Sequence, residues 1–200
     1  MTNEVHWSEL SVTTEDYRAR HGHEGATVWL TGLSGAGKST LAMTSARALF
    51  DRGMNVSVLD ADNLRHGLNS DLGFEDHDRS ENVRRLGEVA LLLASQAQIV
   101  FVTAISPFAA DRLAVRKRHR DSNTKFFEVY VATTAGECAA RDTKGLYERV
   151  AEGTFKGLSG VDAPYEEPVE PEVRIETRDK TIEDCVSEIL TIVLPQISVG

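Results

Sequence analysis

The sequence has few cysteines and no long apolar run. Its 200 residues include two cysteines, Cys138 and Cys185, with no CxxC pair and no cluster of His and Cys at the spacing of a zinc site. This usage favours a reducing compartment and argues against a disulfide framework or a structural metal. No stretch of about 18 apolar residues occurs, and the polar start MTNEVHWSEL lacks the features of a signal peptide. We therefore expect a cytoplasmic protein with no membrane partner.

The chain also has little positive charge. Its 22 Lys and Arg residues stand against 31 Asp and Glu residues, which gives a formal net charge of -9. Binding to nucleic acid or to an anionic membrane has no support from the whole chain, so any anion must be bound by local geometry. The basic run RLAVRKRHR at residues 112–120 has no aromatic residues between its charges and is predicted to be an exposed helix face. We expect no nucleic-acid partner.

The remaining composition is that of an ordinary globular protein. With 41% hydrophobic residues, 15 Gly and 5 Pro, the chain is neither collagen-like nor disordered. Its length suits one buried core, so we expect a single domain over residues 1–200. Two stretches do not look like core: an N-terminal extension over residues 1–25, and the Gly- and Pro-rich residues 153–171. The second stretch is typical of a functional loop or lid.

Short apolar runs alternate with segments of helical periodicity along most of the chain. Strands are predicted at residues 27–31, 56–59, 99–105, 126–131 and 173–176, and helices at residues 38–50, 79–98 and 182–194. Continuous apolar strands separated by helices indicate a parallel sheet covered on both faces. The sequence therefore predicts an α/β protein with a parallel sheet of about five strands, helices on both faces and a lid loop.

A glycine-rich loop joins the first predicted strand to the first predicted helix. Residues 32–39 read GLSGAGKS and satisfy the pattern GxxxxGK[ST] in the strand, loop and helix context that a P-loop NTPase requires. Backbone N–H groups and the helix start would bind phosphate oxygens, Lys38 would reach the β and γ phosphates, and Ser39 would ligate Mg²⁺. The loop predicts ATP and Mg²⁺ as cofactors. Its predicted nucleotide contacts are Gly32, Leu33, Ser34, Gly35, Ala36, Gly37, Lys38, Ser39 and Thr40.

Two aspartates follow the second predicted strand in the sequence LDADNLRH. Asp60 and Asp62 should lie at the carboxyl edge of the sheet, where ligands of open α/β sheets bind and where the phosphate loop also lies. One carboxylate could hold Mg²⁺ through water, and the other could take a proton from an attacking hydroxyl group. The alternative is an Asx turn or a helix N-cap, since a short helical segment follows.

Four arginines come next, at positions 65, 79, 84 and 85. Guanidinium groups bind phosphate or sulfate oxygens through paired hydrogen bonds, so this group predicts an anionic co-substrate. Arg84 and Arg85 are adjacent and point in different directions on a helix, so at least one of them could be merely solvated.

Seven blocks of sequence, in order, resemble the adenylylsulfate kinase (APS kinase) family of P-loop kinases. The resemblance covers about four fifths of the chain and rests on GHEGATVWLTGLSGAGKST, LDADNLRHGLNSDLGF, DRSENVRRLGEVA, AISP, FFEVYV, ECAARDTKGLYERV and GVDAPYEEP. It implies an enzyme that uses MgATP to phosphorylate the 3′-hydroxyl group of adenosine 5′-phosphosulfate in sulfate activation. Because family members are commonly dimers, it also implies a homodimer.

The resemblance assigns roles to matching positions. Catalytic roles would fall to Lys38, Asp62 and Ser106, with Ser106 able to carry phosphate, and Ser39 and Asp60 would serve the metal. Arg141 and Thr177 would lie on the ATP side, and about residues 144–171 would form the lid. Substrate contacts would come from Asp62, Arg65, Phe74, Arg79, Asn82, Ile105, Ser106, Lys144 and Leu158. Phe74 would stack on the substrate adenine.

Four positions depart from the family pattern. Ala61 replaces a Gly, Phe108 and Ala109 replace a Tyr-Arg pair, and Leu158 replaces a lid Phe. Leucine offers no π face for an adenine. These departures motivate an alternative function, a phosphotransferase acting on another anionic nucleotide or phosphorylated small molecule. A guanine-nucleotide switch has weak support, because no NKxD occurs to read guanine, and a purely structural protein would leave the clustered charges without a ligand.

Overall fold

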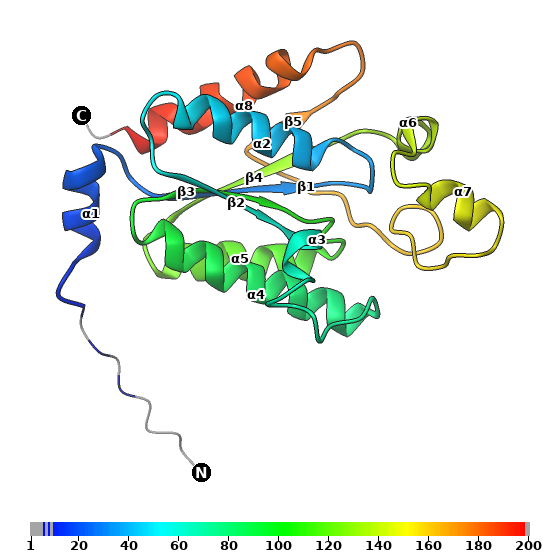
Figure 1. Ribbon diagram of the computed structural model, residues 1–200, viewed down its shortest axis with the longest axis horizontal. Helices are drawn as coiled ribbons and strands as arrows, with labels where there is room; N and C mark the ends of the chain where they lie inside the picture. Colours follow the sequence, from blue (N-terminus) through cyan, green and yellow to red (C-terminus); the bar gives the residue numbers. More distant parts are fainter. Residues whose placement is uncertain (1–5, 7, 9, 199–200) are drawn as a thin grey trace.

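The fold is a five-stranded parallel sheet between two layers of helices (Figure 1). The computed structural model describes residues 6, 8 and 10–198. The strands are β1 (Ala26–Thr31), β2 (Val56–Asp60), β3 (Ile99–Thr103), β4 (Lys125–Val131) and β5 (Val173–Ile175), and they lie in the order β2-β3-β1-β4-β5. All four neighbouring pairs are parallel. The predicted α/β class and P-loop sheet are confirmed.

Helices cover both faces of this sheet. The upper layer in Figure 1 contains α2 (Lys38–Phe50) and α8 (Ile182–Ile197), and the lower layer contains α4 (Asp76–Ala94) and α5 (Ala109–Asp121). Every residue of β1 and β3 is buried, because these central strands have a helix layer on each side. The apolar runs in the sequence are therefore continuous.

Short helices lie at the two ends of the sheet. Helix α1 (Thr14–His21) lies at the amino ends of the strands, while α3 (Ala61–Leu64), α6 (Ala135–Arg141) and α7 (Leu146–Ala151) lie at the carboxyl ends (Figure 1). Thr13, Thr134 and Thr181 begin α1, α6 and α8 with capping boxes, in which the threonine hydroxyl and an acidic side chain satisfy free backbone N–H groups. The polar residues between the apolar runs thus define where helices start.

The structure corrects three predictions about burial and boundaries. The 112–120 run is not a wholly exposed face, because Arg112 and His119 are buried. The stretches expected to lie outside the core also contribute to it, since His23 and Leu158 are buried. The predicted strand at residues 99–105 ends earlier, at Thr103, and residues 104–108 form the loop that leads to α5.

No helix in the described part of the chain is long and apolar enough to cross a membrane.

Candidate active site

The phosphate loop connects the carboxyl end of β1 to the start of α2. Gly37 precedes α2 with a φ of 106°, a conformation that residues with a side chain rarely adopt. Gly32 also has no room for a side chain, because a Cβ there would lie 2.6 Å from the carbonyl oxygen of Val131 in β4. The two glycines let the loop turn tightly enough for its N–H groups to converge near the N-terminus of α2, as phosphate binding requires.

Lys38 lies across the base of this loop. Its ammonium group donates to the carbonyl oxygens of Gly32 at 2.9 Å and Leu33 at 2.7 Å. Burial first and the positive charge of Lys144 second lower the pKa of Lys38 to about 8, against the opposing effects of Cys138, Asp62 and Asp60. A cation that is incompletely solvated and held at the loop is well placed to interact with phosphate oxygens.

Asp60 receives hydrogen bonds from the end of β3, from the first turn of α3 and from Ser39 at the start of α2. Its Oδ2 accepts from the hydroxyl groups of Ser39 and Thr103, both at 2.7 Å, and its Oδ1 accepts from the N–H groups of Asp62 and Asn63. Burial raises the pKa of this carboxyl group, but these hydrogen bonds hold it below its usual value. Asp60 is also the N-cap of α3, so the N-cap interpretation holds for Asp60.

Asp62 is the freer of the two carboxylates. It lies in the first turn of α3 and is exposed, and its Oδ2 accepts a hydrogen bond from the ammonium group of Lys144 at 2.5 Å. Lys144 lies 82 residues further along the chain, between α6 and α7. The ion pair brings the lid region to the end of β2 and keeps a cation within reach of any anion that approaches Asp62.

A cavity of about 630 Å³ joins these groups. It is lined by the phosphate loop, both aspartates, the β3 end, the α4 start and the lid region. The predicted site residues that line it are Ser34, Gly35, Gly37, Lys38, Ser39, Thr40, Asp60, Asp62, Phe74, Arg79, Ile105, Arg141, Lys144 and Leu158. Segments far apart in sequence therefore meet at the carboxyl edge of the sheet, as expected for a ligand site in a parallel α/β fold.

The far side of the cavity combines an aromatic ring with guanidinium groups. Phe74 is 62% exposed, and the Arg65 guanidinium lies 4.2 Å from its ring centre. Arg79 donates to the lid through the Ser159 hydroxyl group at 3.1 Å and the Gly157 carbonyl oxygen at 2.7 Å. An exposed ring next to cationic groups can accept a nucleobase on one face and an anion beside it.

Seven predicted site residues do not line this cavity. Gly32, Leu33 and Ala36 are buried parts of the phosphate loop, and Arg65 lies behind Phe74 with its guanidinium on the carbonyl groups of Leu72 and Gly73. The other three are Asn82, Ser106 and Thr177. Asn82 is buried and accepts from Asn69 at 2.9 Å, and Thr177 pairs with Thr133 and accepts from Arg141.

Ser106 turns its side chain into the interior. Its hydroxyl group accepts from the Trp29 indole N–H at 3.1 Å and donates to the Thr31 hydroxyl group at 3.0 Å, and the residue is only 2% exposed. With both hydrogen-bonding directions used inside the protein, this side chain supports the loop that carries Ile105. The role predicted for Ser106 as a carrier of phosphate has no surface access in this structure.

Nine residues that line the cavity were not predicted as site residues, and two of them carry a cation or an aromatic ring. Arg149 of α7 and Phe155 of the lid both line the cavity, and the Arg149 guanidinium lies 5.2 Å from the Phe155 ring centre. Phe155 lies within a Gly- and Pro-rich segment, where no local pattern indicates which apolar side chain faces the cavity. Arg149 lies on a short helix with no distinguishing pattern.

The residues present fit Mg²⁺ bound together with phosphates. The described residues contain no group of three or more His, Cys, Asp or Glu side chains able to hold a metal. Mg²⁺ typically uses one or two protein oxygens and completes its shell with substrate phosphates and water. The Ser39 hydroxyl group and the Asp60 carboxylate, 2.7 Å apart beside the phosphate loop, match that requirement.

The parallel sheet, the phosphate loop before α2 and the paired aspartates after β2 define a P-loop protein that binds nucleoside triphosphates. Residues 24–176 match the family described as "Adenylylsulphate kinase". The adenylyl-sulfate kinase of Bacillus licheniformis is 45% identical over 196 residues, or 98% of each chain, and that of Bacillus velezensis is 46% identical over 194 residues, or 96% of this chain and 98% of its own.

A solved structure gives the same result. The Mycobacterium tuberculosis APS kinase in complex with AMPPNP and APS superimposes with a TM-score of 0.83 at 47% identity, covering 86% of this chain and 98% of that one. The chain therefore belongs to the adenylylsulphate kinase family.

Proposed function

We propose that this protein transfers the γ-phosphoryl group of ATP to the 3′-hydroxyl group of adenosine 5′-phosphosulfate, giving ADP and 3′-phosphoadenylylsulfate. One observation carries the proposal: the phosphate loop and Asp62 open into a single cavity that also holds an exposed aromatic ring and Arg79. Family membership and the related kinase bound to AMPPNP and APS support the choice of substrates.

The reacting groups would act as follows. The 3′-oxygen of the acceptor attacks the γ-phosphorus while its proton passes to the Asp62 carboxylate, and the bond from the γ-phosphorus to the β–γ bridging oxygen breaks to release ADP. Lys38 and the loop N–H groups stabilise the negative charge that develops on the transferred group. Lys144, paired with Asp62 in the structure, holds that carboxylate in position.

Ser39 and Asp60 would hold Mg²⁺, which would supply positive charge to neutralise the phosphates. The pair also fixes the start of α2 relative to the end of β2, because the Ser39 hydroxyl group donates to the carboxylate of Asp60. Arg141 lies at the edge of the same cavity, where it would contact the nucleotide, and its hydrogen bond to Thr177 orients it.

The acceptor would lie between α4 and the lid. Phe74 would stack on the adenine, and Arg79 would exchange its lid contacts for the phosphosulfate oxygens, with Arg65 supplying positive charge behind the ring. Leu158 would cover the opposite face of the adenine. Asn82 would contact the substrate only through a rearrangement of its bond to Asn69.

A second candidate is an APS-kinase-like phosphotransferase for a different anionic nucleotide or phosphorylated small molecule. It is favoured by Leu158, which lines the cavity without a π face, whereas Ala109 does not line the cavity and gives no support. Ala61 gives it no support, because this residue begins α3 without a positive φ.

The decisive experiment measures ADP release with adenosine 5′-phosphosulfate against a panel of other hydroxyl-bearing anions. The proposal expects adenosine 5′-phosphosulfate to have the highest kcat/KM. A preference of about tenfold or more for any other acceptor would favour the second candidate.

We further propose that the chain acts as one domain, with residues 1–25 as an N-terminal extension and about residues 144–171 as the lid, in the cytoplasm. Its assembly would be a homodimer. Sedimentation velocity should then give twice the 22.0 kDa of one chain.

A further inference from the structure

Arg112 of α5 is a charged side chain in the interior, only 3% exposed. A buried guanidinium is costly unless it is paired and hydrogen-bonded. Its Nε donates to the Glu128 carboxylate of β4 at 2.8 Å, which compensates the charge. The two remaining nitrogens do not bind carboxylates. They donate to backbone carbonyl groups on two other segments, so this residue does more than complete an ion pair.

The first of these segments is the β3–α5 loop, residues 104–108. Arg112 Nη1 donates to the Ser106 carbonyl oxygen at 2.6 Å. Ser106 has a φ of 43°, which a residue with a side chain adopts only when its surroundings hold it there. Ile105, the residue before it, lines the cavity, and its carbonyl oxygen accepts from the Thr31 hydroxyl group at 2.6 Å. The loop therefore carries one wall of the active site in a conformation that needs external support.

The second segment is the lid stem, residues 164–167, where the lid returns to the body of the protein. Arg112 Nη2 donates to the Glu166 carbonyl oxygen at 2.7 Å. The Glu166 N–H group donates to the Pro107 carbonyl oxygen at 2.8 Å, and its carboxylate accepts from the Ala109 N–H group at 2.6 Å. The Tyr165 hydroxyl group lies 3.0 Å from that of Thr31. The lid stem is thus bound to the β3–α5 loop on several sides.

We propose that Arg112 is a positioning residue for the acceptor side of the active site, where its guanidinium fixes the β3–α5 loop against the lid stem and so sets the separation between Ile105 and the lid. The inference rests on the proposed function for the identity of the acceptor. It does not involve the phosphate loop, to which Arg112 donates no hydrogen bond. An arginine suits the task because its planar fork directs donors to three acceptors at once, whereas a lysine ammonium cannot span them.

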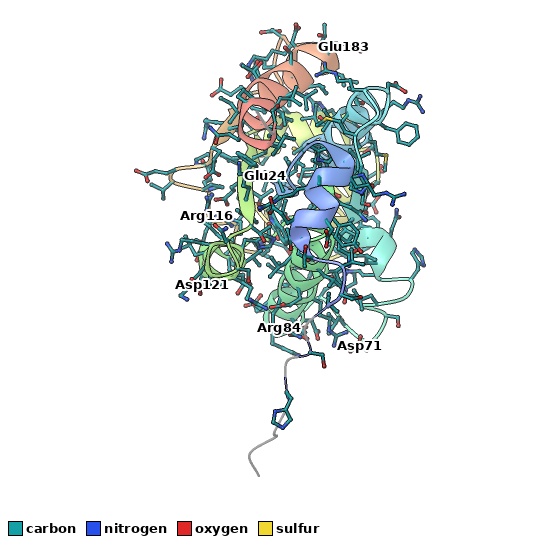
Figure 2. All side chains as sticks on the ribbon, turned by 90° about the vertical axis from the view of Figure 1, so that its left-hand side faces the viewer. Glu24, Asp71, Arg84, Arg116, Asp121 and Glu183 are labelled. Carbon is teal, nitrogen blue, oxygen red and sulfur yellow. The ribbon has the colours of Figure 1, made fainter. Side chains whose placement is uncertain are left out.

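The neighbouring Arg116 provides a matched control. It lies on the same helix, binds the other oxygen of Glu128 at 3.1 Å, and pairs with Glu172, but it contacts neither the β3–α5 loop nor the lid stem in its hydrogen bonds. Figure 2 labels Arg116 in the view from the side of the molecule where α1 lies, and Arg116 is not among the residues that line the active-site cavity. Loss of Arg116 removes a cation from the same ion-pair network and leaves the proposed clamp in place.

The test compares the paired variant Arg112→Met/Glu128→Gln, in which both buried charges are removed together, with Arg116→Met and the conservative Arg112→Lys. We expect KM for adenosine 5′-phosphosulfate to rise about tenfold in the paired variant, with KM for ATP changed less than about twofold. Arg112→Lys should be intermediate, and Arg116→Met unchanged. If the paired variant does not fold, Arg112→Lys provides the test: KM for adenosine 5′-phosphosulfate should rise while KM for ATP stays nearly unchanged.

Hydrogen exchange of the backbone gives a readout that needs no substrate. Amides of residues 104–109 and of the lid stem should exchange faster in the paired variant and in Arg112→Lys, but not in Arg116→Met. Unchanged exchange in both segments, or equal increases in both KM values together with a lower melting temperature, would overturn the proposal. If the wild type uses another acceptor, the proposed function fails, and the exchange comparison still decides the role of Arg112.

Discussion

Lys38 lies at the phosphate loop and has a lowered pKa. Because its pKa is lowered to about 8 by burial first and by Lys144 second, the free enzyme should lose this cation as the pH rises through that value. We therefore expect kcat/KM for ATP to fall with an apparent pKa near 8, since this quantity reports on the free enzyme.

The variant Lys144→Met tests whether the titration of Lys38 causes this fall of kcat/KM at high pH, the alkaline limb of the pH profile. Removing the neighbouring positive charge should move the alkaline limb to higher pH, whereas Arg149→Met, which removes another cavity cation, should leave it in place. Steady-state pH profiles of the three proteins provide the measurement. If the alkaline limb lies at the same pH in Lys144→Met as in the wild type, a group other than Lys38 causes it.

Asp62 is the second residue whose chemistry can be isolated. Asp62→Asn keeps the size of the side chain but cannot accept the proton of the acceptor, so we expect turnover to fall by about 10² to 10⁴. Equilibrium binding of an ATP analogue should be unaltered. The matched variant Asp60→Asn should weaken Mg²⁺ dependence instead, because Asp60 bonds Ser39. Normal turnover in Asp62→Asn would move the proton acceptor elsewhere.

The sequence predicted individual residues best where a short motif fixes the backbone. The phosphate loop follows the buried strand β1, and Asp60 and Asp62 lie at the end of the half-buried strand β2, so the parallel sheet brings them to the same edge. The inward orientation of the Ser106 side chain was not predictable, because it depends on hydrogen bonds with Trp29 and Thr31, which lie more than 70 positions away. Arg112 was misjudged for the same reason, since its partners come from β4 and the lid stem.

At the scale of elements, the strands were predictable to within about two residues because burial on both faces requires continuous apolar runs. The lid was predictable only as a segment. Its conformation depends on contacts such as those of Arg79 with Gly157 and Ser159, which join it to α4 across the cavity. No local pattern in a Gly- and Pro-rich stretch indicates which of its apolar residues turns inward.

The lid element itself can be tested through Leu158, which is buried and lines the cavity. Leu158→Phe should provide a second aromatic surface opposite Phe74, giving about 1 kcal/mol and a severalfold lower KM for adenosine 5′-phosphosulfate. KM for ATP should be unaffected. Leu158→Met, which adds no π face, is the control. A KM that stays fixed or rises, with an unchanged melting temperature, would count against an adenine held between the two rings.

For the whole molecule, the sequence predicted a parallel sheet but not the strand order β2-β3-β1-β4-β5. Apolar strands buried on both faces resemble one another, so their order is set by the right-handed crossovers and by how helices pack, which no single segment encodes. The order matters for function because it places β1 between β3 and β4. The phosphate loop thereby lies next to the loop that carries Ile105.

The packing of α5 on the sheet should make the stability of the whole fold depend on pH. His119 of α5 is fully buried and its Nε2 lies 2.8 Å from the Thr27 hydroxyl group of β1, while its Nδ1 lies 2.9 Å from the Val115 carbonyl oxygen. Burial lowers the pKa of His119 below the usual 6.5. As the pH falls, the unfolded chain therefore binds a proton at His119 more readily than the folded protein does. The contribution of the neutral His119 to the free energy of unfolding is present above about pH 6.5 and is lost as the pH falls.

We expect the free energy of unfolding, measured by urea denaturation, to decrease between about pH 7 and about pH 5 in the wild type. His119→Gln cannot titrate in this range, so it should be less stable at neutral pH, because it loses packing, but its stability should depend less steeply on pH. Comparison of the two slopes separates His119 from the carboxyl groups with lowered pKa values, such as Asp60, which titrate at lower pH in both proteins. Parallel slopes for the two proteins would show that the imidazole takes up its proton as readily in the folded state as in the unfolded chain.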